Sequence, residues 1–297
     1  MFPGDTLPRQ HAIRQIAGMR LLSLNCWGGR LGRPLVDYLA GTDADLLCLQ
    51  EIVHAPACAQ EWLVYRDDGA ELPQRANLFL ELCAALPGHR AFFCPAARGS
   101  LFHGGEPVAT EWGLATFVRR ELVVIGEARG FVHGDYAASG WGAHPRARNA
   151  HVLRLHDHAA GRSFAFAHVH GLRDTAGKGD SPARHIQARR FADLIRAAAR
   201  PGEALVAAGD FNLLPDSATF ATLAELGLAD LVTARGHADT RTSHYRKQPR
   251  WADYLLVNDR VQVDRFEVVA APEVSDHRPL VLDFTAMRAI SHCAEQA

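Results

Sequence analysis

Polar residues stand at the ends of short apolar segments in five places along this chain. These residues are Asn25, Glu51, His168, the pair Asp210 and Asn212, and the pair Asp276 and His277. The apolar segments have the length and composition of buried β-strands. Any one polar residue could be a turn residue or a buried group with a satisfied hydrogen bond. Taken together, they predict one shared metal-dependent site.

Two of these residues, Glu51 and Asn25, have side chains suited to binding a metal ion and the groups around it. Glu51 directly follows residues 45–49, a nearly wholly apolar run typical of a strand covered on both faces. Mg²⁺ needs only one or two carboxylates besides water and substrate phosphate, so Glu51 alone is sufficient as an anchor. Asn25 follows another strand-like run, where its amide could orient a phosphate oxygen or a bound water. The alternatives are a solvated loop glutamate and an ordinary turn asparagine.

Residues 163–170 form a third strand-like run, in which His168 and His170 would share one face. The pair could bind zinc, or one imidazole could hydrogen-bond a phosphoryl oxygen. We favour the phosphate role for His168 and a supporting role for His170. A chance pairing is the alternative in a chain with 16 histidines.

Asp210 and Asn212 follow the apolar run 203–208, which Gly209 interrupts. An aspartate there can position or receive a proton of an attacking water, and the amide can bind phosphate. The alternative is an Asx turn that leads into the helix after Pro215.

Asp276 and His277 precede the last strand-like run, residues 280–284. His277 has the chemistry of an acid or base, and Asp276 that of a metal contact. A histidine in this role needs an acceptor that fixes its tautomer, and Asp253 is our candidate.

The order of the segments LNCWG, LCLQE, AHVHGL, GDFN, WADYLLV and SDHRPL resembles the endonuclease/exonuclease/phosphatase superfamily, which shares the deoxyribonuclease I-like fold. The resemblance spans residues 20–285. It implies an α/β (α+β) four-layer sandwich, in which two packed mixed β-sheets are flanked by helices. It also implies dependence on Mg²⁺ or Mn²⁺ and hydrolysis of a phosphate ester.

For individual residues, the resemblance implies that Asn25 and Glu51 form the corner that binds metal and phosphate. His168 stands where the family has the histidine of its Thr-His-Leu motif, although Ala167 and Val169 flank it here. In the implied mechanism a water attacks phosphorus in line with the leaving group. The metal at Glu51 neutralises developing charge, and His168 and the Asn212 amide bind the equatorial oxygens.

The remaining motifs imply the proton-transfer groups. Asp210 and Asn212 match the Gly-Asp-x-Asn pair, and Asp276 and His277 match Ser-Asp-His. Asp253 matches the aspartate that orients the final histidine, in a segment that reads Trp-Ala-Asp-Tyr here rather than Arg-Ile-Asp-Tyr. Either His277, held by Asp253, or Asp210 activates the water.

The substrate stays open between a phosphodiester and a phosphomonoester. The Asn-Cys-Trp-Gly segment and the His-x-His pair are similar to neutral sphingomyelinases, whereas the final motifs are shared with nucleases. Arg173 and Lys178 lie in a glycine-containing loop after the third run, where they could contact substrate. From another class, a non-catalytic module that binds a phosphate ligand or a partner is the alternative.

Length and composition suit a compact enzyme: 297 residues and 48% hydrophobic residues are sufficient for a large core. We expect one domain over residues 19–286, between a poorly ordered extension (1–18) and a peripheral tail (287–297). An alternative start at Met19 is left open. Amphipathic helices are expected over residues 33–41, 72–86, 182–199 and 216–226.

The net charge and the cysteines bear on the kind of ligand and on the cellular compartment. A net charge of −1 argues against an extended electropositive surface for nucleic acid, although a local groove would be compatible with it. No segment has the apolar stretch of a signal peptide or a membrane span. The six cysteines include no C-x-x-C pair, and Cys48 lies in a core run, so we expect reduced thiols and a cytoplasmic protein.

Overall fold

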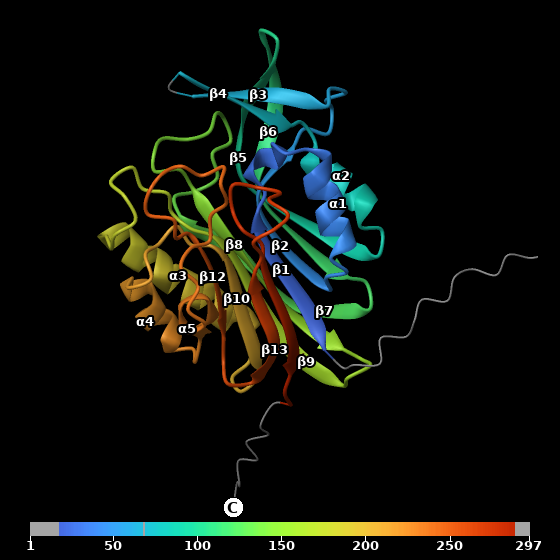
Figure 1. Cartoon of the computed structure of the whole chain (residues 1–297), viewed down its shortest axis with the longest axis vertical. Coiled ribbons are helices and arrows are strands. Elements are labelled where there is room, and N and C mark those ends of the chain that lie inside the picture. Colours follow the sequence, from blue (N-terminus) through green and yellow to red (C-terminus); the bar gives the residue numbers. More distant parts are fainter. Residues whose placement is uncertain (1–17, 68, 289–297) are drawn as a thin grey trace, which may run out of the picture.

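The computed structural model describes residues 18–67 and 69–288. Nearly all of the predicted N-terminal extension and C-terminal tail therefore lies outside the described residues. The described chain forms two β-sheets that pack face to face, with helices on both outer faces (Figure 1). The fold class predicted from the sequence is thus confirmed.

The larger sheet has eight strands in the order β13-β14-β1-β2-β6-β5-β3-β4, and β1 and β2 are parallel while the other pairs are antiparallel. Its strands are β1 (Met19–Asn25), β2 (Leu46–His54), β3 (Trp62–Asp67), β4 (Ala70–Arg75), β5 (His89–His103), β6 (Glu106–Arg119), β13 (Val261–Val268) and β14 (Leu280–Ala286). The far ends of β3 to β6 extend beyond the body of the sandwich (Figure 1).

The smaller sheet has six strands in the order β11-β12-β10-β9-β8-β7, with β9 and β10 parallel. Its strands are β7 (Leu122–His133), β8 (Arg148–Asp157), β9 (Arg162–His170), β10 (Ala204–Asp210), β11 (Ala229–Asp230) and β12 (Asp253–Val257). Apolar side chains of both sheets meet between them. Phe164 on β9 packs edge-to-face on Phe284 of β14, with ring centroids 5.8 Å apart.

Helices cover the outer face of each sheet (Figure 1). The larger sheet carries α1 (Arg33–Gly41) and α2 (Leu78–Ala85), and the smaller sheet carries α3 (Pro182–Ala198), α4 (Ala218–Ala224) and α5 (Leu231–Ala234). A short 3₁₀ turn, η1 (Trp27–Gly29), follows β1. Helix α3 begins after Ser181, whose hydroxyl accepts a hydrogen bond from the Arg184 N–H, and has proline in its first turn. Its buried residues Ala188, Phe191, Ala192 and Ile195 form one stripe facing the sheet.

Two sequence predictions about secondary structure are corrected. Residues 72–86 were expected to be one helix, but the first part belongs to β4, which pairs with β3, and α2 begins only at Leu78. The run 203–208 was expected to break at Gly209, whereas β10 continues through it to Asp210. Gly209 has φ +149°, and a Cβ atom there would lie 1.9 Å from the Val169 carbonyl oxygen. Only glycine lets β10 approach β9 this closely.

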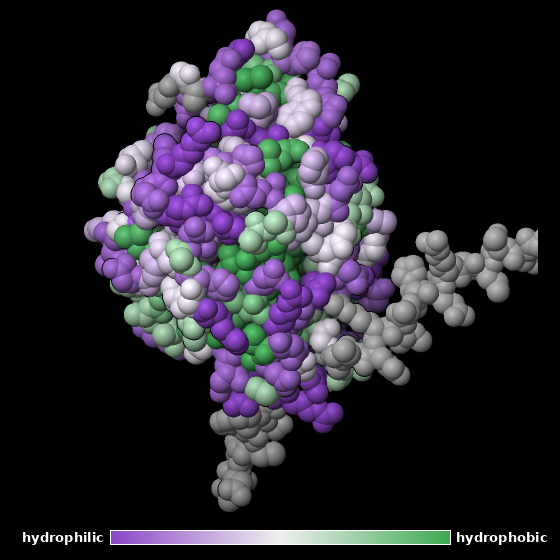
Figure 2. Space-filling model, viewed as in Figure 1, coloured by the Kyte–Doolittle hydropathy of each residue, from purple (hydrophilic) through white to green (hydrophobic). Residues whose placement is uncertain are grey.

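The surface on the viewed face is mainly hydrophilic, with hydrophobic residues in small patches (Figure 2). Within the described residues, no helix has both the length and the apolar character needed to cross a bilayer.

Candidate active site

Most of the polar residues predicted from the sequence converge where the central strands of both sheets end, and His168 is the exception. A cavity of about 750 Å³ opens there, and Glu51, Asp210, Asn212, Asp276 and His277 line it. The two sheets contribute different parts of this site.

A hydrogen bond between Asn25 and Asp210 joins the two sheets at the base of the cavity. The Asn25 amide nitrogen, on β1, donates to Asp210 Oδ2, on β10, over 3.0 Å. The Asn25 side-chain oxygen accepts the Trp27 N–H, and the Ser275 hydroxyl donates to the Asn25 carbonyl oxygen. These contacts fix which way the amide points.

Glu51 reaches the cavity because β2 carries a bulge at that point. The register of β2 against β6 shifts between Leu49 and Ile52, and Glu51 has φ +56°. A bulge turns neighbouring side chains in new directions, so Glu51 lines the cavity while Gln50 is fully buried. Burial raises the pKa of the Glu51 carboxyl, and a hydrogen bond with Asn25 opposes that shift.

The two carboxylate oxygens of Asp276 have different surroundings. Its Oδ2 accepts a hydrogen bond of 2.9 Å from Arg241, whereas its buried Oδ1 has no hydrogen-bond partner among the described residues. Burial raises the pKa of Asp276, which the charges of His277 and Arg241 oppose. An orphaned carboxylate oxygen beside Glu51 and Asn25 gives a set of hard oxygen donors, which Mg²⁺ and Mn²⁺ prefer. The residues present therefore fit such an ion.

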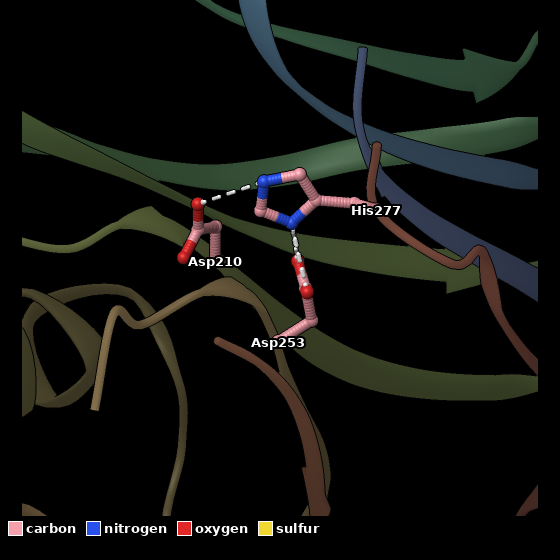
Figure 3. A group of neighbouring side chains, drawn as sticks. All are labelled: Asp210, Asp253 and His277. Atoms are coloured by element: carbon pink, nitrogen blue, oxygen red, sulfur yellow. Dashed lines mark hydrogen bonds and ion pairs between the residues drawn. The ribbon is translucent and has the colours of Figure 1, made fainter. Parts of the chain in front are cut away.

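His277 lies between two aspartates (Figure 3). Its Nδ1 donates to Asp253, whose carboxylate oxygens lie 2.8 and 2.9 Å away, and its Nε2 lies 3.7 Å from Asp210 Oδ2. Burial lowers the pKa of His277 to about 4, and Arg241 adds to that shift. Burial also raises the pKa of Asp253 to about 7. The imidazole is therefore neutral, with its proton on Nδ1 and a lone pair on Nε2.

Asp210, Asp253 and His277 could also hold a metal ion, because their ligand atoms lie within 4.8 Å of one another. The Asp253 carboxylate is already engaged by His277 Nδ1, however, and Mg²⁺ and Mn²⁺ favour oxygen ligands. The Glu51 side of the cavity is the better fit for these two ions.

The prediction that His168 contacts substrate phosphate is wrong. His168 is fully buried between the sheets, where its Nε2 lies 2.7 Å from the Gln50 amide nitrogen and its Nδ1 lies 3.2 Å from Thr116 Oγ1. His170, two residues further along β9, lies at the site instead, with Nε2 3.7 Å from Asp210 Oδ2. Burial lowers the pKa values of both imidazoles well below the usual range.

The structure also removes the zinc hypothesis for this pair. Both ring nitrogens of His168 have hydrogen-bonding neighbours. Across the described part of the chain, the pair belongs to no group of three side chains that could hold a metal ion.

Asn212 and the loop after β9 form a further part of the cavity wall. Asn212 has φ +54°, its N–H bonds Asp210 Oδ1, and its amide lies 3.4 Å from the Gly171 carbonyl oxygen. Arg173 and Lys178 also line the cavity, as the substrate-contact prediction requires. The Lys178 ammonium donates to the Trp251 carbonyl oxygen, and burial lowers its pKa to about 8.

Sequence reasoning missed three arginines that shape the site. Arg148, at the start of β8, and Arg241, which pairs with His277 through the backbone, both line the cavity. The third is Arg184, on α3, which is buried and donates to the carbonyl oxygens of Gly177 and Gly179 in the loop. No local sequence signal marks these residues, because the cavity that they line is built from segments far apart in the chain.

Comparisons with known proteins agree with this architecture. Residues 22–277 match the sequence model of the Endonuclease/Exonuclease/phosphatase family. An inositol phosphosphingolipids phospholipase C of Schizosaccharomyces pombe is 26% identical over 230 residues, which cover 74% of this chain and 47% of that protein. The chain thus spans about half the length of this curated relative.

Two solved structures share the fold. An endonuclease/exonuclease/phosphatase from Beutenbergia cavernae aligns with a TM-score of 0.66 and 16% identity, over 92% of this chain and 73% of that one. A mannosyl-6-phosphatase from Bacteroides thetaiotaomicron aligns with a TM-score of 0.61 and 16% identity, over 90% and 99%. At 16% sequence identity, these structural similarities show a shared fold and nothing about the activity. Because the family match covers most of the chain, the protein belongs to the Endonuclease/Exonuclease/phosphatase family of phosphoester hydrolases.

Proposed function

We propose that the protein is a Mg²⁺- or Mn²⁺-dependent phosphoesterase that hydrolyses a phosphodiester or phosphomonoester by in-line attack of water. One observation carries this proposal. A neutral imidazole, held by Asp253 through Nδ1, directs its free Nε2 toward Asp210 and Asp276 beside a cavity that also holds Glu51. This arrangement places a base next to carboxylates suited to a divalent ion.

Glu51, Asp276 and the Asn25 amide would hold the ion. When bound, a divalent ion supplies Lewis-acid stabilisation of the negative charge that develops on the phosphoryl oxygens.

The chain's own residues would move the proton. His277 Nε2 accepts a proton from the attacking water, and the Asp253 carboxylate stabilises the imidazolium that results. Asp210, 3.7 Å from the same nitrogen, orients the water. His277 rather than Asp210 is the favoured base, because both Asp210 oxygens already accept hydrogen bonds, from Asn25 and the Asn212 N–H. The Asn212 amide, which lines the cavity, contacts the non-bridging oxygens. His170, with Nε2 3.7 Å from Asp210 Oδ2, supports Asp210 from behind.

A phosphodiester is the favoured substrate, since the Schizosaccharomyces pombe relative is named as a phospholipase C. The site residues argue against a non-catalytic module, because the groups needed for proton transfer, His277, Asp253 and Asp210, are all present. We also propose cytoplasmic residence, because the cysteines described, Cys26, Cys48, Cys58, Cys83 and Cys94, are unpaired.

The proposal is tested with bis-p-nitrophenyl phosphate and p-nitrophenyl phosphate, in Mg²⁺, Mn²⁺, Zn²⁺ or EDTA. Wild type should turn over the diester faster than the monoester in Mg²⁺ or Mn²⁺ and be inactive in EDTA. His277→Ala should be inactive, whereas the control His185→Ala, which changes an exposed histidine on α3, should match wild type. Turnover that persists in His277→Ala would refute the assignment of the base, and turnover in EDTA would refute metal dependence.

A further inference from the structure

We propose that the substrate carries a second anionic group, beyond the phosphate that is hydrolysed, and that this group binds to Arg148, Arg173 and Arg146 on one wall of the cavity. The inference rests on the proposed function and specifies its substrate: a small organic phosphodiester that bears an additional phosphate, sulfate or carboxylate.

The charge of the cavity differs in sign from that of the protein. Nine lysines and arginines line the cavity against four carboxylates, although the chain as a whole has a net charge of −1. Among the described residues, only Arg146 and Arg241 of these nine lie within ion-pair distance of a carboxylate. A wall with this excess of unpaired cations is suited to a ligand with more than one negative charge.

Arg148 is the residue of this wall that supports the inference most directly. It is only 5% exposed, yet its Nε and Nη1 donate to the backbone oxygens of Gly171 and Ala147 rather than to a carboxylate. Its Nη2 has no hydrogen-bond partner within the described chain, and its guanidinium carbon lies 5.2 Å from the centre of the Trp112 ring. Burial lowers the pKa of Arg148 to about 10. Burying an arginine without an ion pair is costly, so an anionic ligand would relieve a cost already present in the fold.

Two more arginines lie close enough to Arg148 for their charges to oppose its protonation. The charges of Arg173 and Arg146 both lower the pKa of Arg148. Arg146 is oriented by Tyr65 and Asp67, at 2.6 and 2.7 Å, and Arg173 has no ion pair within the described chain. All three guanidinium groups line the same cavity, although like charges repel, and within the described chain only Arg146 has a carboxylate partner.

The hydrolysed phosphate does not account for all of these charges. It must lie next to His277 and the carboxylates Glu51 and Asp276, where the divalent ion of the proposed function would already offset its single charge. Glu51 and Asp210 raise the pKa of Arg148, but both have other partners in the proposed reaction. The cavity, at about 750 Å³, is in the range of small-molecule sites and has room for a second group.

A matched pair of chromogenic diesters tests the inference: thymidine 5′-(p-nitrophenyl phosphate) and its 3′-phosphorylated counterpart. They differ by one phosphate, and both release p-nitrophenol. For wild type in Mn²⁺ we expect a KM at least about tenfold lower for the doubly phosphorylated ester, because a phosphate would form charge-assisted bonds with the arginines. Arg173→Gln and Arg146→Gln should each remove most of that difference in KM.

The control is Arg189→Gln, which removes an exposed arginine of α3 outside the cavity. It should keep the full difference in KM. Equal KM values in wild type, or a difference unchanged in both cavity variants, would overturn the inference while leaving the phosphoesterase proposal intact. A KM that falls further with oligothymidylate length would replace the small ester with a nucleic acid.

If neither ester is hydrolysed, the proposed function fails, and binding then decides the subsite separately. Calorimetry with thymidine 3′,5′-bisphosphate and thymidine 5′-monophosphate should give tighter binding of the bisphosphate to wild type, and a smaller preference in Arg173→Gln. Equal affinities would refute the second anion site.

Discussion

His168 Nε2 lies 2.7 Å from the side-chain nitrogen of Gln50, across the interface between the two sheets. The same Gln50 nitrogen donates to the Cys48 carbonyl oxygen, so it is the donor, and His168 Nε2 accepts. The His168 proton is therefore on Nδ1, where it donates to Thr116 Oγ1. The Thr116 hydroxyl then donates to His151 Nδ1. This buried chain of hydrogen bonds runs from the bulge in β2 to strand β8.

His168 thereby supports Glu51, because Gln50 is the preceding residue at the bulge. We expect His168→Ala to weaken Mn²⁺ binding about 10- to 100-fold, the usual effect of losing a group that supports a metal ligand. His168→Gln, whose side-chain oxygen can accept from Gln50, should recover part of the loss. Titration calorimetry with Mn²⁺ measures both.

The control for that change is Val152→Ala on β8, which removes buried volume without touching Gln50. It should lower stability and leave Mn²⁺ affinity unchanged. Equal loss of affinity in His168→Ala and Val152→Ala would mean that general loosening, not support of Glu51, is responsible.

His168 also predicts a pH dependence of stability. Burial lowers its pKa well below 6.5, so below pH 6.5 the unfolded chain binds a proton that the native state does not. The free energy of unfolding should then fall with decreasing pH, by about 1.4 kcal/mol per pH unit for this histidine until its native pKa is reached. Urea unfolding of wild type and His168→Gln between pH 7 and 5 measures the difference. Parallel curves for the two proteins would contradict the prediction.

Asp253 and Glu51 should affect different steps. Asp253→Asn removes the carboxylate that stabilises the His277 imidazolium, so kcat should fall at least about tenfold while Mn²⁺ affinity stays unchanged. Turnover at saturating Mn²⁺, together with calorimetry, checks both quantities. Loss of Mn²⁺ binding in this variant would instead support a metal site at Asp210, Asp253 and His277.

Glu51→Gln keeps the shape of the side chain and removes its charge. We expect Mn²⁺ affinity to fall at least about tenfold, because a carboxylate is the preferred anchor of a hard cation. The Mn²⁺ concentration needed for half-maximal activity should rise in parallel with the calorimetric dissociation constant. An unchanged dissociation constant would place the ion elsewhere.

Arg184 predicts an effect on both stability and substrate binding. Arg184→Met should lower the free energy of unfolding by about 2–4 kcal/mol, because four carbonyl oxygens lose their donor, two of them in the buried residues Leu172 and Asn212. It should also raise KM, since those carbonyls belong partly to the loop that carries Lys178. Chemical unfolding and steady-state kinetics test this, with the exposed Arg190→Met as the matched control. An unchanged KM would show that the loop keeps its position without Arg184.

The sequence predicted the parts of the fold that depend on local pattern. Strands β1, β2, β9, β10 and β14 each contain all or nearly all of a predicted apolar run, and helix α1 has the predicted bounds. Strand β4 was missed because its state is set by pairing with β3. His168 was preferred to His170 because a two-residue period gives the face of a side chain, but not how far the strand continues toward its edge.

The hydrogen bond of His277 to Asp253 agrees with the residue pairing expected from the sequence. Other contacts could not be foreseen from local pattern. Asn25 forms a hydrogen bond with Asp210, which lies 185 residues away along the chain. The role inferred for Arg148 depends on the other residues that line the cavity with it. Such pairs are set by the packing of one sheet on the other.

The hydrogen bond between Asn25 and Asp210 joins the two sheets at the proposed site. Catalytic activity should therefore depend on the position of one sheet relative to the other. The proposed cation ligands sit on one half and most of the proton-transfer groups on the other, so neither half alone contains a working centre. A small slip between the sheets would separate the reacting groups while every strand kept its own hydrogen bonds. On heating, activity should therefore vanish before the circular dichroism of the strands begins to change.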